Sequence, residues 1–124
     1  HLIVSKLKNP KAQIIVIGGD YISKYAMSAG ALAINTLSQF QFDRCFIGCA
    51  GVDVDENCSY TAEAETREMK NVAMKNAKHS YLLIDSSKVG VKGFCKFKML
   101  DCFDKIYCDK KDNNLEYPDN FEWV

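Results

Sequence analysis

The sequence lacks long hydrophobic runs, a net charge and closely paired cysteines, and each absence narrows the possible functions. No apolar run in the 124 residues approaches the ~20 that a helix needs to cross a bilayer, so no membrane partner is expected. Sixteen lysine and arginine residues balance sixteen aspartate and glutamate residues, so no strong field attracts nucleic acid. If the protein contacts DNA, we expect that surface to lie outside this chain.

Six cysteines are present, but none belongs to a C-x-x-C pair and only two histidines accompany them. A zinc site, which typically combines such groups, is therefore not expected, and no other metal or cofactor is indicated. Cys45 and Cys108 lie within apolar runs, where a thiol packs as a small hydrophobe. We expect reduced, structural cysteines in a cytoplasmic protein; the alternative is a set of disulfides.

Short apolar runs alternate with helical patterns in a chain that is 48% hydrophobic and 26% charged, as in one globular domain. Buried strands are predicted at 12–17, 44–48, 81–84 and 105–108. Helices are predicted at about 28–40 and 61–79, the second with Thr61 as its N-cap.

The remaining segments receive less definite predictions. Residues 1–9 look like the last turns of a helix, and residues 49–60 are expected to form a polar loop. Residues 94–100 alternate in polarity and are expected to form either an exposed strand or an irregular segment. The turn-rich residues 113–124 are expected to pack as a tail.

Strand–helix–strand order predicts right-handed crossovers and a mostly parallel α/β sheet, whose strands all end at one edge, where ligands bind. Glycines and polar residues follow each predicted strand, at 18–20 (GGD), 48–53 (GCAGVD), 85–88 (DSSK) and at Asp109. These groups are therefore expected to meet at that edge. Each also has an ordinary structural explanation as a turn former, a cap or a solvated lysine.

Five segments together resemble the C-terminal effector-sensing domain of the DeoR family of bacterial transcriptional regulators. They are IIVIGGDY, SAGALAINTL, FDRCFIGCAGVD, EMKNVAMKNA and YLLIDSSKVG, within a resemblance that runs from about Leu2 to Asp109. It implies a Rossmann-like, mostly parallel sheet with flanking helices, shared with ribose-5-phosphate isomerase and coenzyme A transferases. It also implies that residues 1–124 form a partial sensor domain, without its first part and without a DNA-binding helix-turn-helix.

The resemblance implies the function of an effector-binding domain in a transcriptional repressor, not that of an enzyme. The expected partners are a phosphorylated sugar or related metabolite, operator DNA through the absent domain only, and further copies in a homo-oligomer. The residues implied at the effector site are Gly18, Gly19, Gly48, Gly51, Asp53, Lys70, Asp85 and Lys88.

Two other functions remain open, a sugar-phosphate isomerase and a module that serves only oligomerisation. In the isomerase relatives, carboxylates correspond to Ala50 and Gly51, and the general base corresponds to Met69. A methyl group, a hydrogen and a thioether cannot replace carboxylates in proton transfer. The sequence therefore favours a binding site without catalysis, in which Lys70 and Lys88 attract an anion.

Overall fold

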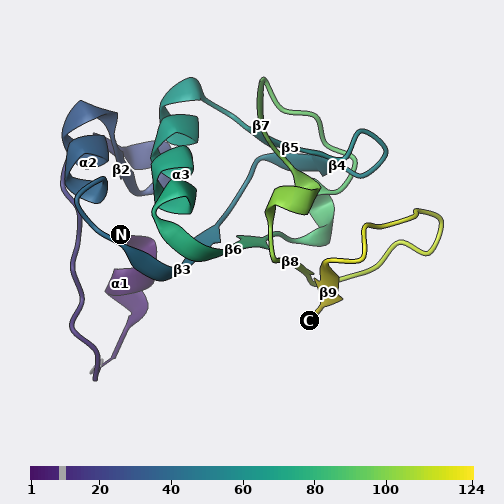
Figure 1. The fold of residues 1–124 in the computed structure, drawn as a ribbon, viewed down its shortest axis with the longest axis horizontal. Helices are drawn as coiled ribbons and strands as arrows, with labels where there is room; N and C mark the ends of the chain where they lie inside the picture. The colour runs from purple at the N-terminus through teal and green to yellow at the C-terminus, as the bar shows by residue number, and fades with distance from the viewer. Residues whose placement is uncertain (9–10) are drawn as a thin grey trace.

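The computed structural model describes residues 1–8 and 11–124 and confirms an α/β fold built on a four-stranded parallel sheet. Its strands lie in the order β3 (Phe42–Ile47), β6 (Ala77–Leu83), β8 (Lys105–Cys108) and β9 (Phe121–Trp123) (Figure 1). Neighbouring strands are parallel throughout. Three of the four predicted strands are therefore confirmed, and the predicted tail packs by adding a strand of its own.

One face of this sheet forms the core beneath α3 (Ala64–Lys75), and α2 (Gly30–Leu37) lies beside α3 on the same side of the sheet in Figure 1. Leu82 and Ile106 are fully buried on this face. Phe46 and Leu83, which alternate with buried residues along their strands, are 60% and 47% exposed on the opposite face. The two helices thus cover one face of the sheet and leave these side chains open to solvent.

Both predicted helices are confirmed with shorter bounds. The first is α2 (Gly30–Leu37), preceded by a hairpin of β1 (Asp20–Ile22) and β2 (Met27–Ala29) that the sequence pattern did not predict. The second, α3, has Glu63 as its N-cap, so the prediction of Thr61 as N-cap is wrong. Thr61 belongs to a strand, and its hydroxyl donates to the Glu63 carbonyl at 3.2 Å. The last residues of the predicted second helix already belong to β6.

A second, antiparallel sheet includes half of the residues of segment 49–60, which was predicted as a polar loop. In it, β4 (Gly51–Asp53) and β5 (Cys58–Thr61) form a hairpin, and β7 (Cys95–Met99) pairs with β5. The prediction was wrong because polar side chains here are buried and satisfied internally. Ser59, for example, is 0% exposed and donates to the Lys98 carbonyl at 2.8 Å.

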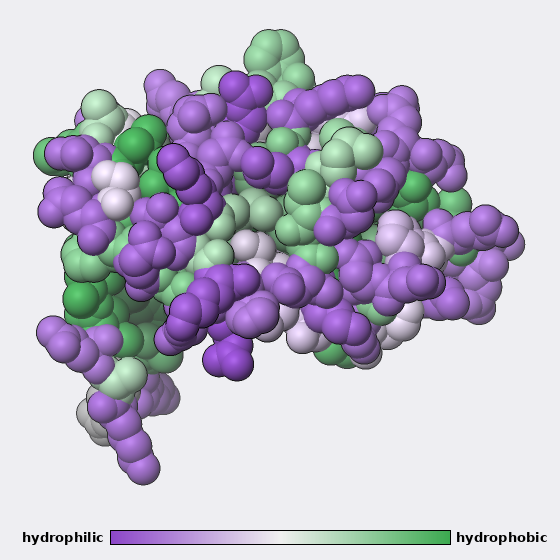
Figure 2. Space-filling view, viewed as in Figure 1, coloured by the Kyte–Doolittle hydropathy of each residue, from purple (hydrophilic) through white to green (hydrophobic). Residues whose placement is uncertain are grey.

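The predicted strand at 12–17 is wrong, because these residues are irregular and pair with no described strand. Ile14, Ile15 and Val16 are 41%, 67% and 50% exposed. Leu2, Ile3 and Val4 of α1 (Leu2–Lys6) are exposed as well. Figure 2 shows hydrophobic surface at the left, on the side where Figure 1 labels α1. A β-branched run favours a strand, but a strand also needs a neighbour for its backbone hydrogen bonds.

Three smaller predictions can also be compared with the described residues. A short helix, α1, lies near the start of the chain, although Asn9, at the end of the predicted helical turns, lies outside the described residues. The strand alternative for 94–100 is confirmed by β7. Cys45 and Cys108 are 8% and 0% exposed and pack as small hydrophobes, as predicted. No helix in the described part is long and apolar enough to span a membrane.

Candidate functional site

A cavity of about 300 Å³ opens where β3 ends, beside the first turns of α3 and the connection between β1 and β2. Gly48 and Lys70, two of the predicted site residues, both line it. The full lining consists of Tyr25, Met27, Gly48, Cys49, Ala50, Ala62, Thr66 and Lys70. The predicted topology places ligand sites at the carboxyl ends of parallel strands. The cavity lies at such an end, that of β3.

Local structure positions these residues in two ways. Residues 48–50 follow β3 and turn towards β4. The Ala50 N–H donates to the Tyr60 carbonyl at 2.8 Å. Thr66 and Lys70 are four residues apart on α3, so they lie on the same helix face. The Thr66 hydroxyl donates to the Glu63 carbonyl at 3.0 Å, which fastens the start of the helix.

Of the described residues that line the cavity, Lys70 alone has a charged side chain. Burial lowers the pKa of its ammonium group, and the nearby Cys49 acts in the opposite direction. Its Nζ lies 5.8 Å from the centre of the Phe97 ring, within the range of a cation–π contact. The ion pairs formed by the described residues do not include Lys70, so its charge is free to meet an anion.

The Cys49 thiol shows which other predicted residues lie near this cavity. Burial raises the pKa of the thiol to about 11. The charge of Lys70, the backbone N–H of Gly51 and the charge of Lys88 each lower this pKa, whereas Asp85 raises it further. Four predicted site residues therefore lie within electrostatic reach of one side chain in the cavity wall.

Several lining residues were missed by the sequence analysis. Cys49 directly follows Gly48 at the end of a predicted strand, and Thr66 precedes Lys70 at helical spacing, so both carried a usable signal. Tyr25 and Met27 carried none, because they belong to the hairpin region that the pattern did not predict.

The polar residues 85–88 that follow β6 have a structural role, which begins with Asp85. Its Oδ1 caps the short helix η2 (Ser86–Lys88) by accepting the Ser87 hydroxyl and, at 2.9 Å, the Ser87 N–H, and these bonds lower the pKa of Asp85. The Ser86 N–H donates to Asp109 Oδ1 at 2.6 Å. The polar ends of β6 and β8 therefore meet as predicted, and both carboxylates fix the loop.

Asp53, another predicted site residue, is not among the described residues that line the cavity. It is 8% exposed, and its Oδ1 accepts the Glu56 N–H at 3.0 Å while its Oδ2 pairs with Lys92 Nζ at 2.9 Å. These contacts, the Glu56 N–H first, hold the pKa of Asp53 below its ordinary value. The carboxylate is thus already engaged within the turn between β4 and β5.

Gly18 and Gly19 do not follow a strand, contrary to the prediction for the segment before them. Gly19 has a φ of 138°, which favours glycine, and a Cβ there would lie 2.6 Å from the Ala29 carbonyl oxygen. It permits the chain to pack closely against the start of α2. Neither glycine is among the described residues that line the cavity.

Gly48 and Gly51 differ in the space around them. A Cβ at Gly48 would meet nothing within 4 Å, in keeping with its place in the cavity wall. A Cβ at Gly51 would overlap the backbone carbonyl of Val91. Gly51 therefore permits the close approach of β4 to the segment that follows η2.

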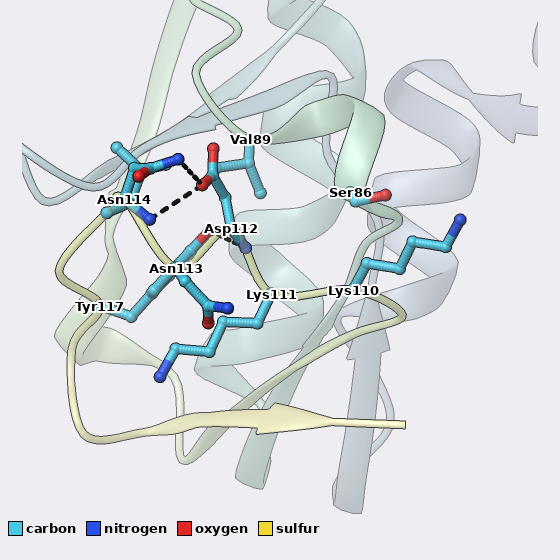
Figure 3. A pocket seen from close by; sticks show the side chains of 9 residues that line it. Ser86, Val89, Lys110, Lys111, Asp112, Asn113, Asn114 and Tyr117 are labelled. Carbon is cyan, nitrogen blue, oxygen red and sulfur yellow. Dashed lines mark hydrogen bonds between the residues drawn. The ribbon is translucent and has the colours of Figure 1, made fainter.

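A larger cavity of about 560 Å³ lies between η2 and the loop 110–117. Figure 3 shows Lys110 and Lys111 extending from this loop in different directions, so their charges do not converge. Asp112 accepts hydrogen bonds from the Asn114 N–H and side-chain amide at 2.9 and 3.0 Å. Because these polar groups satisfy one another, the smaller cavity is the better candidate for an effector site.

Comparison with protein families gives one match that covers most of the chain. The family model described as the DeoR C terminal sensor domain matches residues 1–110. The last fourteen residues lie outside this match, although β9, which belongs to them, pairs with β8 in the parallel sheet.

Curated proteins of similar sequence are transcriptional regulators. The chain is 27% identical over 120 residues to the lactose phosphotransferase system repressor of Staphylococcus epidermidis, covering 97% of this chain and 46% of the relative. It is 28% identical over 97 residues to the glycerol-3-phosphate regulon repressor of Escherichia coli, covering 78% and 38%. It is 28% identical over 104 residues to the L-fucose operon activator of Escherichia coli, covering 84% and 42%. The chain thus spans less than half the length of these relatives.

Proposed function

Because the chain belongs to the family of DeoR C-terminal sensor domains, we propose that its cavity binds a phosphorylated sugar or a related anionic metabolite as the effector of a transcriptional regulator. The observation that carries this proposal is the position of Lys70 in the wall of the cavity, beside the residues that follow β3. The charge of Lys88 also acts on the Cys49 thiol in the same wall. Lys70 is partly desolvated and has no described carboxylate partner. A phosphate group would supply the missing charge through strong, charge-assisted hydrogen bonds.

The relatives support the same ligand class. Two of them are named as repressors of the lactose phosphotransferase system and of the glycerol-3-phosphate regulon, and a third as an activator of the L-fucose operon. This chain would likewise respond to a metabolite of carbohydrate use. Operator DNA would be bound by another domain of the polypeptide, since the balanced charge of this chain favours no such contact.

The cavity is poorly suited to the isomerase alternative. None of the described residues that line it carries a carboxylate, and Ala50 stands where the isomerases have an acid. Met69, beside Lys70, replaces their general base. Acid–base catalysis requires a group that exchanges protons near neutral pH, so we propose binding without turnover.

We also propose that these residues form part of a larger sensor domain. In the described part of the chain, β3 pairs on one edge only, with β6. The exposed Phe46 stacks on Tyr81 at 5.3 Å on the open face of the sheet. Because parallel sheets are normally covered on both faces, further elements of the polypeptide would cover this face and give residues 12–17 a partner. The complete protein would form the homo-oligomer that palindromic operators favour.

Thermal unfolding of the complete protein tests the ligand class. We expect at least one compound from a panel of ribose 5-phosphate, glycerol 3-phosphate and hexose phosphates to raise the unfolding temperature by several degrees. A ligand at a hundred times its dissociation constant contributes about 2.7 kcal/mol to the folded state. Each unphosphorylated parent serves as the control. Equal stabilisation by the parent compound, or none by the whole panel, would contradict the proposal.

A further inference from the structure

The segment after η2 runs alongside β4 and is joined to it through the backbone. Val89 forms a parallel bridge with Val52, and the Gly90 N–H donates to the Val52 carbonyl at 2.8 Å. Lys88 directly precedes this segment. The position of the Lys88 ammonium group therefore depends on how firmly the segment is held against β4.

Lys92 fastens the far end of this segment to the turn between β4 and β5. Its Nζ lies 2.8 Å from Glu56 Oε1 and 2.9 Å from Asp53 Oδ2. Side-chain hydrogen bonds to Glu56 and then to Asp53 raise the pKa of Lys92 well above its ordinary value. The Tyr60 hydroxyl donates to the other Glu56 carboxylate oxygen at 3.0 Å, which orients that carboxylate for the lysine.

We propose that Lys92 is a positioning residue: by bridging Asp53 and Glu56 it holds segment 88–91 where Lys88 can reach the negative group of the effector. This inference rests on the proposed function of the cavity. Lys92 is not among the described residues that line the cavity, so it acts through the loop and not by touching the ligand. Asp53, which was predicted to contact the effector, serves the same purpose by pairing with Lys92.

The test compares three variants of the complete protein. Lys92→Met removes the charge at nearly constant length, and Lys92→Arg keeps the charge and the donors. Lys96→Met is the matched control, because Lys96 Nζ lies 3.8 Å from Glu56 and its side chain is 75% exposed. Two quantities are measured in each protein, the hydrogen-exchange rate of the Gly90 amide and the affinity for inorganic phosphate.

Lys92→Met is expected to speed exchange at Gly90 and to weaken phosphate binding, each about fivefold, near the upper end of what a partly exposed ion pair contributes. We expect Lys92→Arg to restore both quantities and Lys96→Met to change neither. Unchanged exchange in Lys92→Met would show that Lys92 does not hold the loop. Faster exchange with unchanged phosphate affinity would overturn the link between the loop and the ligand.

A failure of the proposed function gives a different result. If the wild-type protein does not bind inorganic phosphate, the cavity proposal is contradicted, and with it the link between Lys92 and ligand affinity. The exchange rate at Gly90 then still decides whether Lys92 holds the segment against β4.

Discussion

Gly51→Ala is expected to destabilise the folded protein by about 3 kcal/mol, the upper part of the usual range for overpacking a core. The added methyl group would overlap the backbone carbonyl of Val91, which cannot rotate away as a side chain would. β4 would have to move from the segment after η2, at the cost of the hydrogen bond between Gly90 and Val52. Thermal unfolding of the complete protein should show a fall of roughly 10 °C.

Gly48→Ala is the matched control for this substitution. Both glycines belong to the same strand–loop–strand segment, but a Cβ at Gly48 would meet nothing within 4 Å. We expect a change in stability of less than about 0.5 kcal/mol. If Gly51→Ala unfolded at the wild-type temperature, the close approach of β4 to Val91 would be wrong, and the account of the loop with it.

Lys70→Met is expected to weaken effector binding at least tenfold, which corresponds to about 1.4 kcal/mol. The substitution removes the charge from the cavity while keeping an unbranched side chain beside Phe97. Because burial already disfavours the Lys70 charge, its loss should not lower the stability of the ligand-free protein. Calorimetric titration with the stabilising sugar phosphate measures the first effect, and thermal unfolding without ligand measures the second.

Lys75→Met provides the comparison on the same helix. Lys75 is exposed in the last turn of α3 and is not among the described residues that line the cavity. Its substitution should leave effector affinity within a factor of two of the wild-type value. Equal losses in the two variants would indicate a general effect of positive charge and would remove Lys70 from the site.

The parallel sheet was predictable because its strands are short apolar runs, two of which are joined through a helix. In these segments the local sequence favours a strand and the fold provides a partner strand. β6 illustrates this agreement, since Leu82 is fully buried in the run that the sequence identified. Residues 12–17 have the same local pattern but no described partner strand. The local sequence determines only how strongly a segment favours extended backbone. Whether another strand lies beside it to accept its hydrogen bonds depends on the whole fold.

The candidate site was predictable in part, for a similar reason. Topology placed Gly48 at the end of its strand, and the family resemblance implied Lys70, which lines the same cavity. The pattern could not reveal that the carboxylate of Asp53 would be satisfied by Lys92, since the two are far apart in sequence. Nor could it reveal Tyr25, which reaches the cavity through a hairpin region without a clear sequence signal.

The most direct test of the central claim is a crystal structure of the complete protein with the sugar phosphate that stabilises it. We expect the phosphate group to lie beside residues 48–51, within hydrogen-bonding distance of the ammonium group of Lys70 or Lys88. A phosphate bound instead between η2 and loop 110–117, or elsewhere on the surface, would contradict the assignment of the effector site to the cavity at the end of β3.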